Sequence, residues 1–379
     1  DTATYRWSAL PMAGDVGGDP AAPTMSPADF HLFCALRQAR RPDAMTTLTT
    51  HDTKRSEDVR ARLCVLSELP EEWSAAVAIW QARATSLLRE QRTEPQHAAS
   101  SPEGQWPDAA ALYLLWQTVI SCWPIGEDRL LPYLTKALRE AKVHTSWTAP
   151  DEAYEKSVLD FARLALSDEQ LRAAIEKFSE RVAKYATINS LTQKLLQLTM
   201  TGVPDVYQGS EIDFQALVDP DNRRPVDFAA LAGRLDAVAG GRFTAGSVSP
   251  DPTDLPARPV LSEAKMLVVA KALRLRREHP DWFDARAGQT PLFPAGPAAE
   301  HAVSFLRGRR VAVVGTRLPV GLKRAGGWRG TALNLPAGTW RCELTGRVYE
   351  MGTELGDEVR LEQLTRVLPV ALLVLQDER

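Results

Sequence analysis

The sequence predicts an α/β protein followed by a domain of short strands. A β-branched run, Thr46 to Thr50, is typical of a buried strand, and the polar pair His51-Asp52 and a helix start come directly after it. Apolar residues then recur at the helical period from Glu57 to about Ile188. Beyond Asp284 the pattern changes to short alternating segments, most of them separated by Gly and Pro, as in a β-sandwich.

The composition is that of an ordinary globular protein. The chain has 379 residues, of which 44% are hydrophobic, enough for two or three domains. Its formal net charge is -3, and it has no basic block or basic stripe that would suggest a nucleic-acid partner. No apolar run approaches the ~18 residues of a membrane helix, and the first residues lack the pattern of a signal peptide. We therefore expect no nucleic-acid partner and no membrane association.

The four cysteines predict neither a disulfide framework nor a zinc site, because they are scattered and none forms a C-x-x-C pair. They are Cys34, Cys64, Cys122 and Cys342. Reduced thiols and a cytoplasmic location are the expectation.

Residues 1–43 read as a loop followed by a helix. Ser26 is a suitable N-cap with Pro27 at the first helical position, and the helix is expected to end near Arg41-Pro42. The predicted strand at Thr46 to Thr50 follows this helix.

The charged residues that follow the polar pair allow two interpretations. They are Lys54, Arg55, Glu57, Asp58 and Arg60. The first interpretation is a capped, solvated helical turn with its acids near the positive end of the helix dipole. The second is a functional edge, because in an α/β barrel the C-terminal ends of the strands carry the chemistry. The spacing alone favours the first.

The helical region contains tryptophans that could stack on sugar rings or fill a core. Trp73, Trp80 and Trp116 all fall on the apolar stripe, which favours the core. The interruption from Glu94 to Asp108, rich in Pro, is predicted to be a loop.

A second polar loop follows a long predicted helix that runs from Asp168 to Lys184 or slightly beyond. Gly202 and Pro204 flank a very short strand, and Gly209 permits a tight exit. The loop itself then carries Asp219, Asp221, Asn222, Arg223 and Arg224. It lacks the alternating oxygen ligands and distal Glu of an EF-hand, so a salt-bridged or sugar-binding loop is favoured over a metal site.

The remaining elements are a helix and a set of strands. The segment Gly240 to Pro259 is typical of a surface linker, and a helix is predicted from Leu261 to His279, with Pro280 as its stop. Strands are predicted at 302–306, 311–316, 331–335, 339–344 and 367–375. We expect this last domain to have a structural or packing role.

Two motifs carry a family resemblance. THDTKRSEDVRAR, Thr50 to Arg62, resembles a signature of the maltooligosyltrehalose synthases, a branch of the α-amylase superfamily. PDVYQGSE and LVDPDNRRPVDF, within Pro204 to Phe228, resemble the second signature, in the expected order. The likeness runs from DTATYRW at the first residue to PVALLVL near the end. Thr4 and Trp7 stand where the family pattern has Phe and Tyr.

The resemblance implies the C-terminal part of a (β/α)8 TIM barrel with a helical insertion, followed by a β-sandwich domain. The barrel segment would be residues 1–56, and the inserted helical subdomain 57–188. The last barrel strand, loop and helix would be 189–283, and the β-sandwich 284–379. The other barrel strands would lie upstream of Asp1, so we expect a fragment that is inactive without its N-terminal half.

The resemblance also implies a reaction, an intramolecular transglucosylation. It converts the reducing-end α-1,4 link of a maltooligosaccharide into an α,α-1,1 (trehalose) link, with no cofactor and no metal. Asp52 would be the third carboxylate of the family, with His51 beside it, while the nucleophile and general acid would lie in the N-terminal half. Tyr207 and Gln208 would line the mouth of the site.

Four basic residues are candidates for holding the released glucose: Lys54, Arg55, Arg223 and Arg224. The alternative is that they form buried ion pairs with Glu57, Asp58, Asp219 and Asp221, and the two interpretations have similar weight.

Two rival functions stay open. One is another α-amylase-superfamily enzyme, a hydrolase or glucanotransferase. The other is a non-catalytic carbohydrate-binding fragment when the chain is alone.

Overall fold

The computed structural model describes residues 2–93, 107–239, 259–352 and 358–376, which form two compact units. The first unit comprises Asp1–Pro23, His51–Val182 and Gln215–Arg224, and the second comprises Thr24–Thr50, Ala183–Phe214 and Pro225–Arg379. Each unit therefore gathers segments that are distant in the sequence. Within the described residues, no helix combines the length and the apolarity needed to cross a bilayer.

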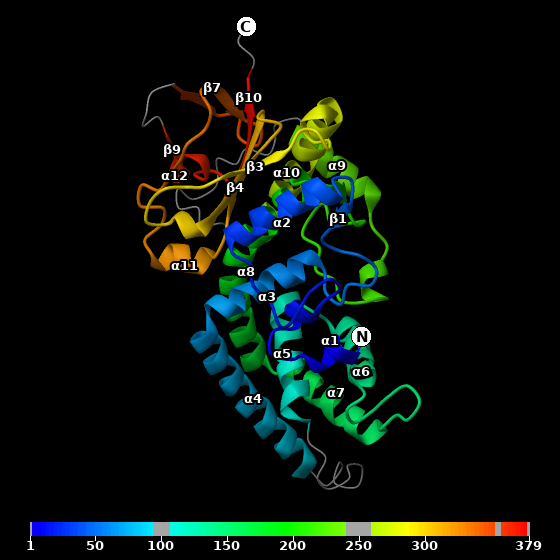
Figure 1. The fold of residues 1–379 in the computed structure, drawn as a ribbon. Coiled ribbons are helices and arrows are strands. Elements are labelled where there is room, and N and C mark those ends of the chain that lie inside the picture. Colours follow the sequence, from blue (N-terminus) through cyan, green and yellow to red (C-terminus); the bar gives the residue numbers. More distant parts are fainter. Residues whose placement is uncertain (1, 94–106, 240–258, 353–357, 377–379) are drawn as a thin grey trace. The chain divides into compact units, whose positions relative to one another are not determined.

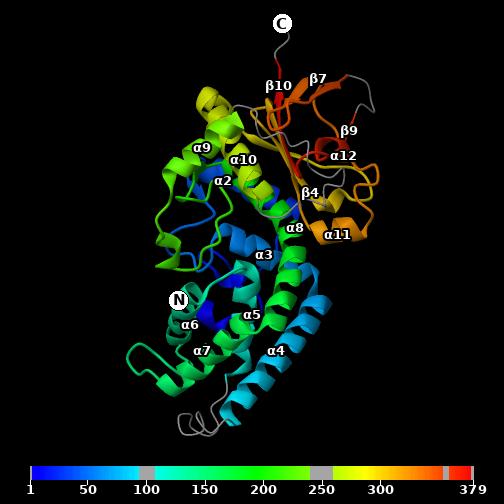
Figure 2. The same cartoon turned by 180° about the vertical axis from the view of Figure 1, so that it is seen from behind.

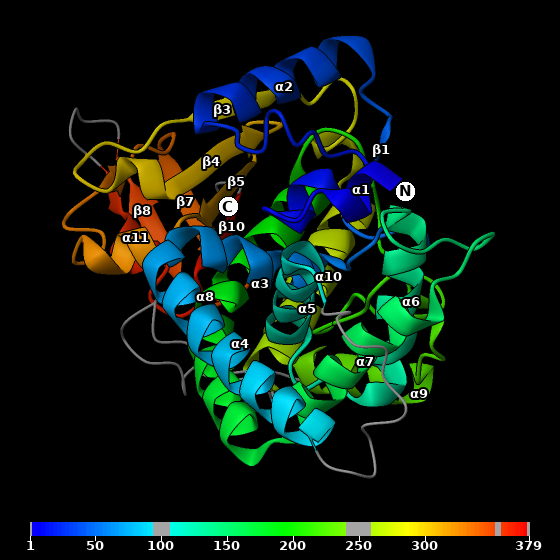
Figure 3. The same ribbon diagram turned by 90° about the horizontal axis from the view of Figure 1, so that it is seen from below.

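The first unit is helical, and its helices α3 to α7 are labelled in Figure 3. Its elements are α1 (Thr2–Arg6), η1 (Pro11–Gly14), α3 (Glu57–Glu68), α4 (Pro70–Thr93), α5 (Ala109–Cys122), α6 (Glu127–Ala141), α7 (Glu152–Ser167), the first part of α8 (Glu169–Thr199) and η2 (Asp221–Arg223). The helix α8 is one continuous element, longer than the sequence predicts. Of the predicted loop that ends at Asp108, residues 94–106 lie outside the described part.

An aromatic cluster fills the core of this helical unit. Trp80 lies with its ring 5.9 Å from that of Trp73 and 5.6 Å from that of Trp116, centroid to centroid. Trp116 in turn lies 5.9 Å from Phe161 of α7. All three tryptophans are buried. The prediction that they are core residues is confirmed, because their rings pack against one another.

The second unit begins with the helix whose start the sequence predicts. The helix α2 runs over Pro27–Arg40, and Ser26 and Asp29 form a capping box in which each side chain accepts the backbone N–H of the other. Arg41 is its C-cap, as predicted.

A parallel strand pair follows α2. The strand β1 (Met45–Thr47) pairs with β2 (Val203–Asp205) in parallel. The expectation of a buried strand over Thr46–Thr50 is wrong, since the strand is shorter and its Met45 side chain is 68% exposed. Its only partner among the described strands is β2, so little of it is covered.

Gly202 allows the chain to enter β2 close to the start of β1. Its φ is +126°, and a Cβ atom there would lie 2.6 Å from the carbonyl oxygen of Ala44. A larger residue would be excluded both by backbone conformation and by space. The prediction that Gly202 borders a very short strand is confirmed, but Pro204 lies within β2 instead of flanking it.

The second unit contains a six-stranded antiparallel sheet with the order β3-β4-β5-β10-β7-β8. Several of its strands are labelled in Figure 1. Its strands are β3 (Gln289–Leu292), β4 (Ala302–Arg307), β5 (Val311–Thr316), β7 (Gly338–Cys342), β8 (Val348–Met351) and β10 (Val370–Leu375), while β6 (Ala332–Leu333) pairs separately with β9 (Val359–Arg360). The strands predicted at 302–306, 311–316, 339–344 and 367–375 are present as β4, β5, β7 and β10, and the one at 331–335 is reduced to β6. The edge strands β3 and β8 were not predicted.

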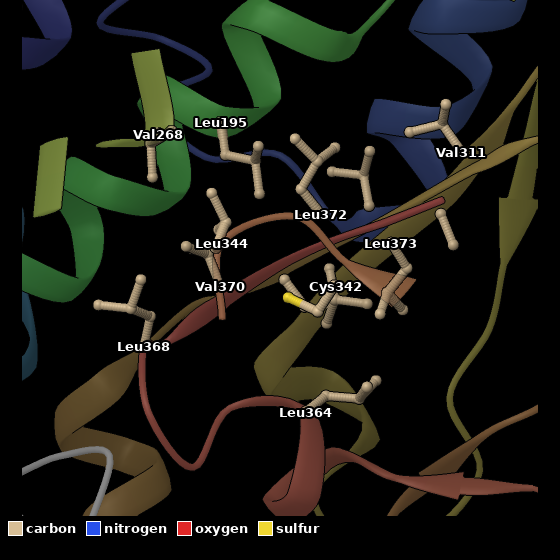
Figure 4. Close-up of a cluster of buried hydrophobic side chains, with 14 of the residues drawn as sticks. Leu195, Val268, Val311, Cys342, Leu344, Leu364, Leu368, Val370, Leu372 and Leu373 are labelled. Carbon is tan, nitrogen blue, oxygen red and sulfur yellow. The ribbon is translucent and has the colours of Figure 1, made fainter. Parts of the chain in front are cut away.

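Both faces of the central strands are covered. Every residue of β4 and β5 is buried, rather than every second one. Side chains of α8, of α10 (Pro259–Glu278) and of the segment around α12 (Leu361–Leu364) gather about β10, as Leu195, Val268 and Leu364 illustrate in Figure 4. Figure 2 shows α10 beside α9 (Phe228–Ala239). The other described helical elements of this unit are α11 (Pro319–Arg324), η4 (Pro280–Trp282) and η5 (Ala299–His301). Residues 240–258 of the predicted linker lie outside the described part.

The helix α8 lies directly against β5 at a glycine. A Cβ atom on Gly315 would come within 2.7 Å of the methyl carbon of Thr192, and the Thr192 hydroxyl donates to the carbonyl oxygen of Thr316 at 2.8 Å. The close approach of helix and strand therefore depends on the absence of a side chain at Gly315.

We expect Gly315→Ala to destabilise the second unit by about 1–2 kcal/mol through overpacking. Thr192→Ser removes the clashing methyl but keeps the hydroxyl, so the double variant should recover most of this loss. The measurement is the free energy of unfolding in a double-mutant cycle. If the free-energy changes of the two single substitutions simply add in the double variant, the clash between the new Cβ atom and the Thr192 methyl does not cause the loss.

Candidate functional site

The polar pair His51-Asp52 lies at the start of the first unit's largest segment, on a turn before α3. The Nε2 atom of His51 lies 3.3 Å from Oδ2 of Asp52, and the two side chains are 58% and 71% exposed. Both functional groups are therefore accessible from solvent in this chain.

The loop of the second signature holds this turn in place. The side-chain amide of Asn222 donates to the carbonyl oxygen of His51 at 2.9 Å. The backbone N–H of Ser56 donates to the carbonyl oxygen of Ala216 at 2.8 Å, and the N–H of Ala216 donates to Ser56 Oγ at 3.0 Å. Segments 51–56 and 215–224 thus form one substructure, a contact that no spacing in the sequence predicts.

The charged turn is not solvated, which corrects the first of the two interpretations of this segment. Ser56 occupies the N-cap position of α3, but its hydroxyl bonds Ala216 instead of capping its own helix. Glu57 and Asp58 are buried, and the side chains of Lys54 and Arg55 retain only 6% and 1% exposure. The contact with residues 215–224 covers this turn.

Lys54 and Arg55 point into the helical unit. Lys54 Nζ donates to the carbonyl oxygen of Asp52 at 3.3 Å and lies 6.0 Å from the centre of the Tyr5 ring. Arg55 Nη2 donates to the hydroxyl of Tyr133 at 2.8 Å. Its Nε and Nη1 atoms have no hydrogen-bond partner within the described ranges. Arg55 is thus a buried cation, and two of its three guanidinium nitrogens are without a hydrogen-bond partner among the described residues.

Asp221 anchors the second loop. Its two carboxylate oxygens accept from Nε and Nη2 of Arg129 at 2.8 and 2.9 Å, and the N–H of Leu217 donates to it at 2.8 Å. Burial alone would raise the pKa of the Asp221 carboxyl, but the hydrogen bonds from Arg129 and Leu217 outweigh it and keep the pKa below its usual value of 3.8. Arg129, on α6, was not a candidate in the sequence.

Arg223 and Arg224 form the ion pairs that the alternative interpretation expects, but these pairs are only partly buried. Arg223 Nε lies 2.7 Å from Asp219 Oδ1, with side-chain exposures of 55% and 38%. Arg224 Nε lies 3.1 Å from Asp221 Oδ1. Both guanidinium groups can still reach solvent, so pairing does not exclude contact with a ligand.

Tyr207 and Gln208 lie in the second unit, on the turn after β2. The Tyr207 ring is 6.0 Å from the Phe214 ring, and the Tyr207 carbonyl oxygen accepts from Ser210 N–H at 2.9 Å. Gly209 has a φ of +83°, as the predicted tight exit requires. The other candidates all belong to the first unit.

Among the described residues, no group of three or more His, Cys, Asp or Glu side chains is arranged to hold a metal ion.

Comparisons with known proteins identify the relatives of this chain. No protein-family model matches it. A protein of Mycobacterium tuberculosis named "Putative maltooligosyl trehalose synthase" is 39% identical over 381 residues, which is 99% of this chain and 43% of the relative. The chain therefore spans less than half the length of this curated relative.

Solved structures give the same answer. The maltooligosyltrehalose synthase from Arthrobacter ramosus is 38% identical with a TM-score of 0.83, covering 99% of this chain and 44% of that one. A hypothetical maltooligosyl trehalose synthase of Sulfolobus tokodaii is 26% identical with a TM-score of 0.70, covering 99% and 44%. The resemblance inferred from the two signatures is confirmed.

We expect Asp221→Asn to destabilise the first unit by about 3 kcal/mol, because it leaves Arg129 largely buried without its carboxylate. The matched control is Asp219→Asn, whose partner Arg223 is half-exposed, and it should cost less than about 1 kcal/mol. Thermal and urea unfolding measure the loss of stability in each variant. Equal losses of unfolding free energy in Asp221→Asn and Asp219→Asn would contradict the anchoring role of Asp221.

The stability difference between wild type and Asp221→Asn should also depend on pH. Because the pKa of Asp221 is lowered by folding, its stabilising contribution is complete above pH 3.8 and is lost as the pH falls below that value through the pKa of the folded state. The stability difference between wild type and Asp221→Asn should therefore shrink below pH 3.8.

Proposed function

We propose that this chain, a relative of the maltooligosyltrehalose synthases over 99% of its length, supplies one part of the catalytic site of such an enzyme. The reaction is the intramolecular conversion of a reducing-end α-1,4 link of a maltooligosaccharide into an α,α-1,1 link. The observation that carries the proposal is the accessible His51-Asp52 pair, tied by Asn222 to the second signature loop.

The proposed fold context is an α-amylase-type (β/α)8 barrel. The parallel pairing of β1 and β2, joined by a long crossover that contains helices, supports this context. Asp52 follows the first of these strands, where catalytic residues of such barrels are found. The other strands would belong to the part of the relatives that this chain does not cover.

In the proposed mechanism Asp52 is neither nucleophile nor general acid. A retaining glycosidase places those two carboxyl groups ~5 Å apart across the scissile bond. Asp52 instead accepts hydrogen bonds from the 2- and 3-hydroxyls of the sugar in the cleavage subsite, which strengthen as the ring flattens in the transition state. His51 donates beside it. The nucleophile and the acid are assigned to the N-terminal half of the same enzyme, the proposed partner of this chain.

Rearrangement differs from hydrolysis in that the released glucose must stay in place. Before it is rejoined through its anomeric hydroxyl, water has to be excluded and the sugar held. We assign this role to Arg223 and Arg224, whose guanidinium groups remain accessible. Lys54 and Arg55, the other two candidates, are almost fully buried in this chain, so we propose that they support the turn that carries Asp52. We assign Tyr207 and Gln208 to the mouth of the site.

The test of the proposed function is product analysis on maltohexaose with the complete enzyme. We expect a 1,1-linked product, no turnover by this chain alone, and a catalytic constant lowered by orders of magnitude in Asp52→Asn at unchanged melting temperature. Asp43→Asn, an exposed acid before β1, is the matched control and should be neutral. Glucose as the main product would indicate a hydrolase, longer chains a glucanotransferase, and binding without turnover by the complete enzyme a carbohydrate-binding protein.

We expect Arg223→Ala to change the product ratio. If Arg223 closes the pocket over the released glucose, its loss should let glucose escape or admit water, so free glucose rises relative to the 1,1-linked product. The control is Arg234→Ala, because Arg234 makes a similar exposed ion pair with Glu263 at 2.7 Å outside both signatures. An unaltered ratio with a lowered melting temperature would leave Arg223 only a structural role.

A further inference from the structure

Asp15 is a buried carboxylate that lies outside both signatures and bonds the backbone of the first one. It follows η1 in the first unit, and its side chain is only 4% exposed. Oδ1 accepts from the N–H of Lys54 at 2.9 Å, and Oδ2 accepts from the N–H of Arg55 at 3.1 Å. Oδ1 also accepts from the neighbouring Val16 N–H at 2.7 Å.

These bonds hold the chain immediately after the His51-Asp52 pair. On the other side of the pair, Asn222 holds the carbonyl oxygen of His51 at 2.9 Å. Between the two attachment points lie only Asp52 and the buried Thr53. The Asp52 side chain is exposed and can meet a ligand, while the backbone that carries it is fixed at both ends.

The chemistry of the acceptor matters at this position. An ionised carboxylate offers two acceptor oxygens and no donor, so both can face backbone N–H groups, and such charge-assisted bonds are stronger than neutral ones. An asparagine of the same shape would present an NH₂ group to one of the two N–H groups. Arg60 Nη1 lies 3.8 Å from Oδ2, so the carboxylate also has a guanidinium group beside it.

We propose that Asp15 is a positioning residue for Asp52. It fixes the backbone of Lys54 and Arg55, and through them the place of the catalytic carboxylate, without touching the substrate. This inference rests on the proposed function, because it assumes that Asp52 acts on a sugar. It adds to that function a residue that neither signature contains.

The kinetic test uses Asp15→Asn in the complete enzyme. We expect the catalytic constant for maltohexaose to fall about 10-fold to 100-fold with KM changed less than about twofold, because a small misplacement of a catalytic group affects the transition state most. Asp15→Glu keeps the carboxylate and should recover part of the rate. The matched control is Asp19→Asn, an exposed acid in the same loop whose carboxylate accepts from the nearby Ala21 N–H, and it should be neutral.

A second readout does not depend on activity. Hydrogen exchange of the Lys54 and Arg55 amide protons should be slow in wild type and at least about tenfold faster in Asp15→Asn, while exchange in the helix α5 stays unchanged. Unprotected amides in wild type would overturn the proposal even if the variant failed to fold. So would a folded variant that kept the wild-type catalytic constant, or one that lost melting temperature but kept its rate per folded molecule.

The two proposals can fail separately. If the wild-type complete enzyme makes no 1,1-linked product, the proposed function is wrong, and with it the positioning role. If the wild type is active and Asp15→Asn is equally active, only the positioning role is wrong.

Discussion

The hydrogen bond from the Asn222 side chain to the His51 carbonyl oxygen connects two loops that are 171 positions apart in the sequence. Closing so long a loop costs conformational entropy, and the bond alone would not compensate for it. The surrounding contacts do: Ser56 and Ala216 exchange two hydrogen bonds, and Asp221 receives a bidentate pair from Arg129. The exposed His51-Asp52 pair is defined in space because the segments that hold it are buried and hydrogen-bonded to one another.

The sequence predicted the elements whose signals are local. Ser26 and Pro27 mark the start of α2 correctly, because a capping box is built from neighbouring residues. The edge strand β3 was missed because Pro291 lies within it, and proline is tolerated only where a strand's outer N–H groups need no partner. β8, at the other edge, alternates in burial, but the apolar residue Val348 lies on its exposed side, so the sequence shows no apolar alternation there. The burial of β1 was overestimated, since its composition resembles that of a central strand while its cover depends on distant segments.

In the candidate site, too, the sequence predicts local features but not contacts between distant segments. The motif residues could be identified, but their partners could not, because Asp15, Arg129 and Asn222 act through tertiary contacts that no spacing rule encodes. The misreading of the turn after Asp52 has the same origin. Charges in a row predict solvent exposure unless another segment covers them, and here residues 215–224 do so. The family resemblance added chemical roles that the residues alone would not have suggested.

The depth of these charges also decides how the site responds to ionic strength. Mobile ions screen charges that they can approach, with a Debye length of about 8 Å at physiological salt. They can approach the Arg223-Asp219 pair, with its half-exposed side chains, but not the carboxylate of Asp15 beneath the turn. Salt should thus weaken the pairing of the arginine in the outer loop and leave the backbone that carries Asp52 where it is. One site then contains both a salt-sensitive part and a salt-insensitive one.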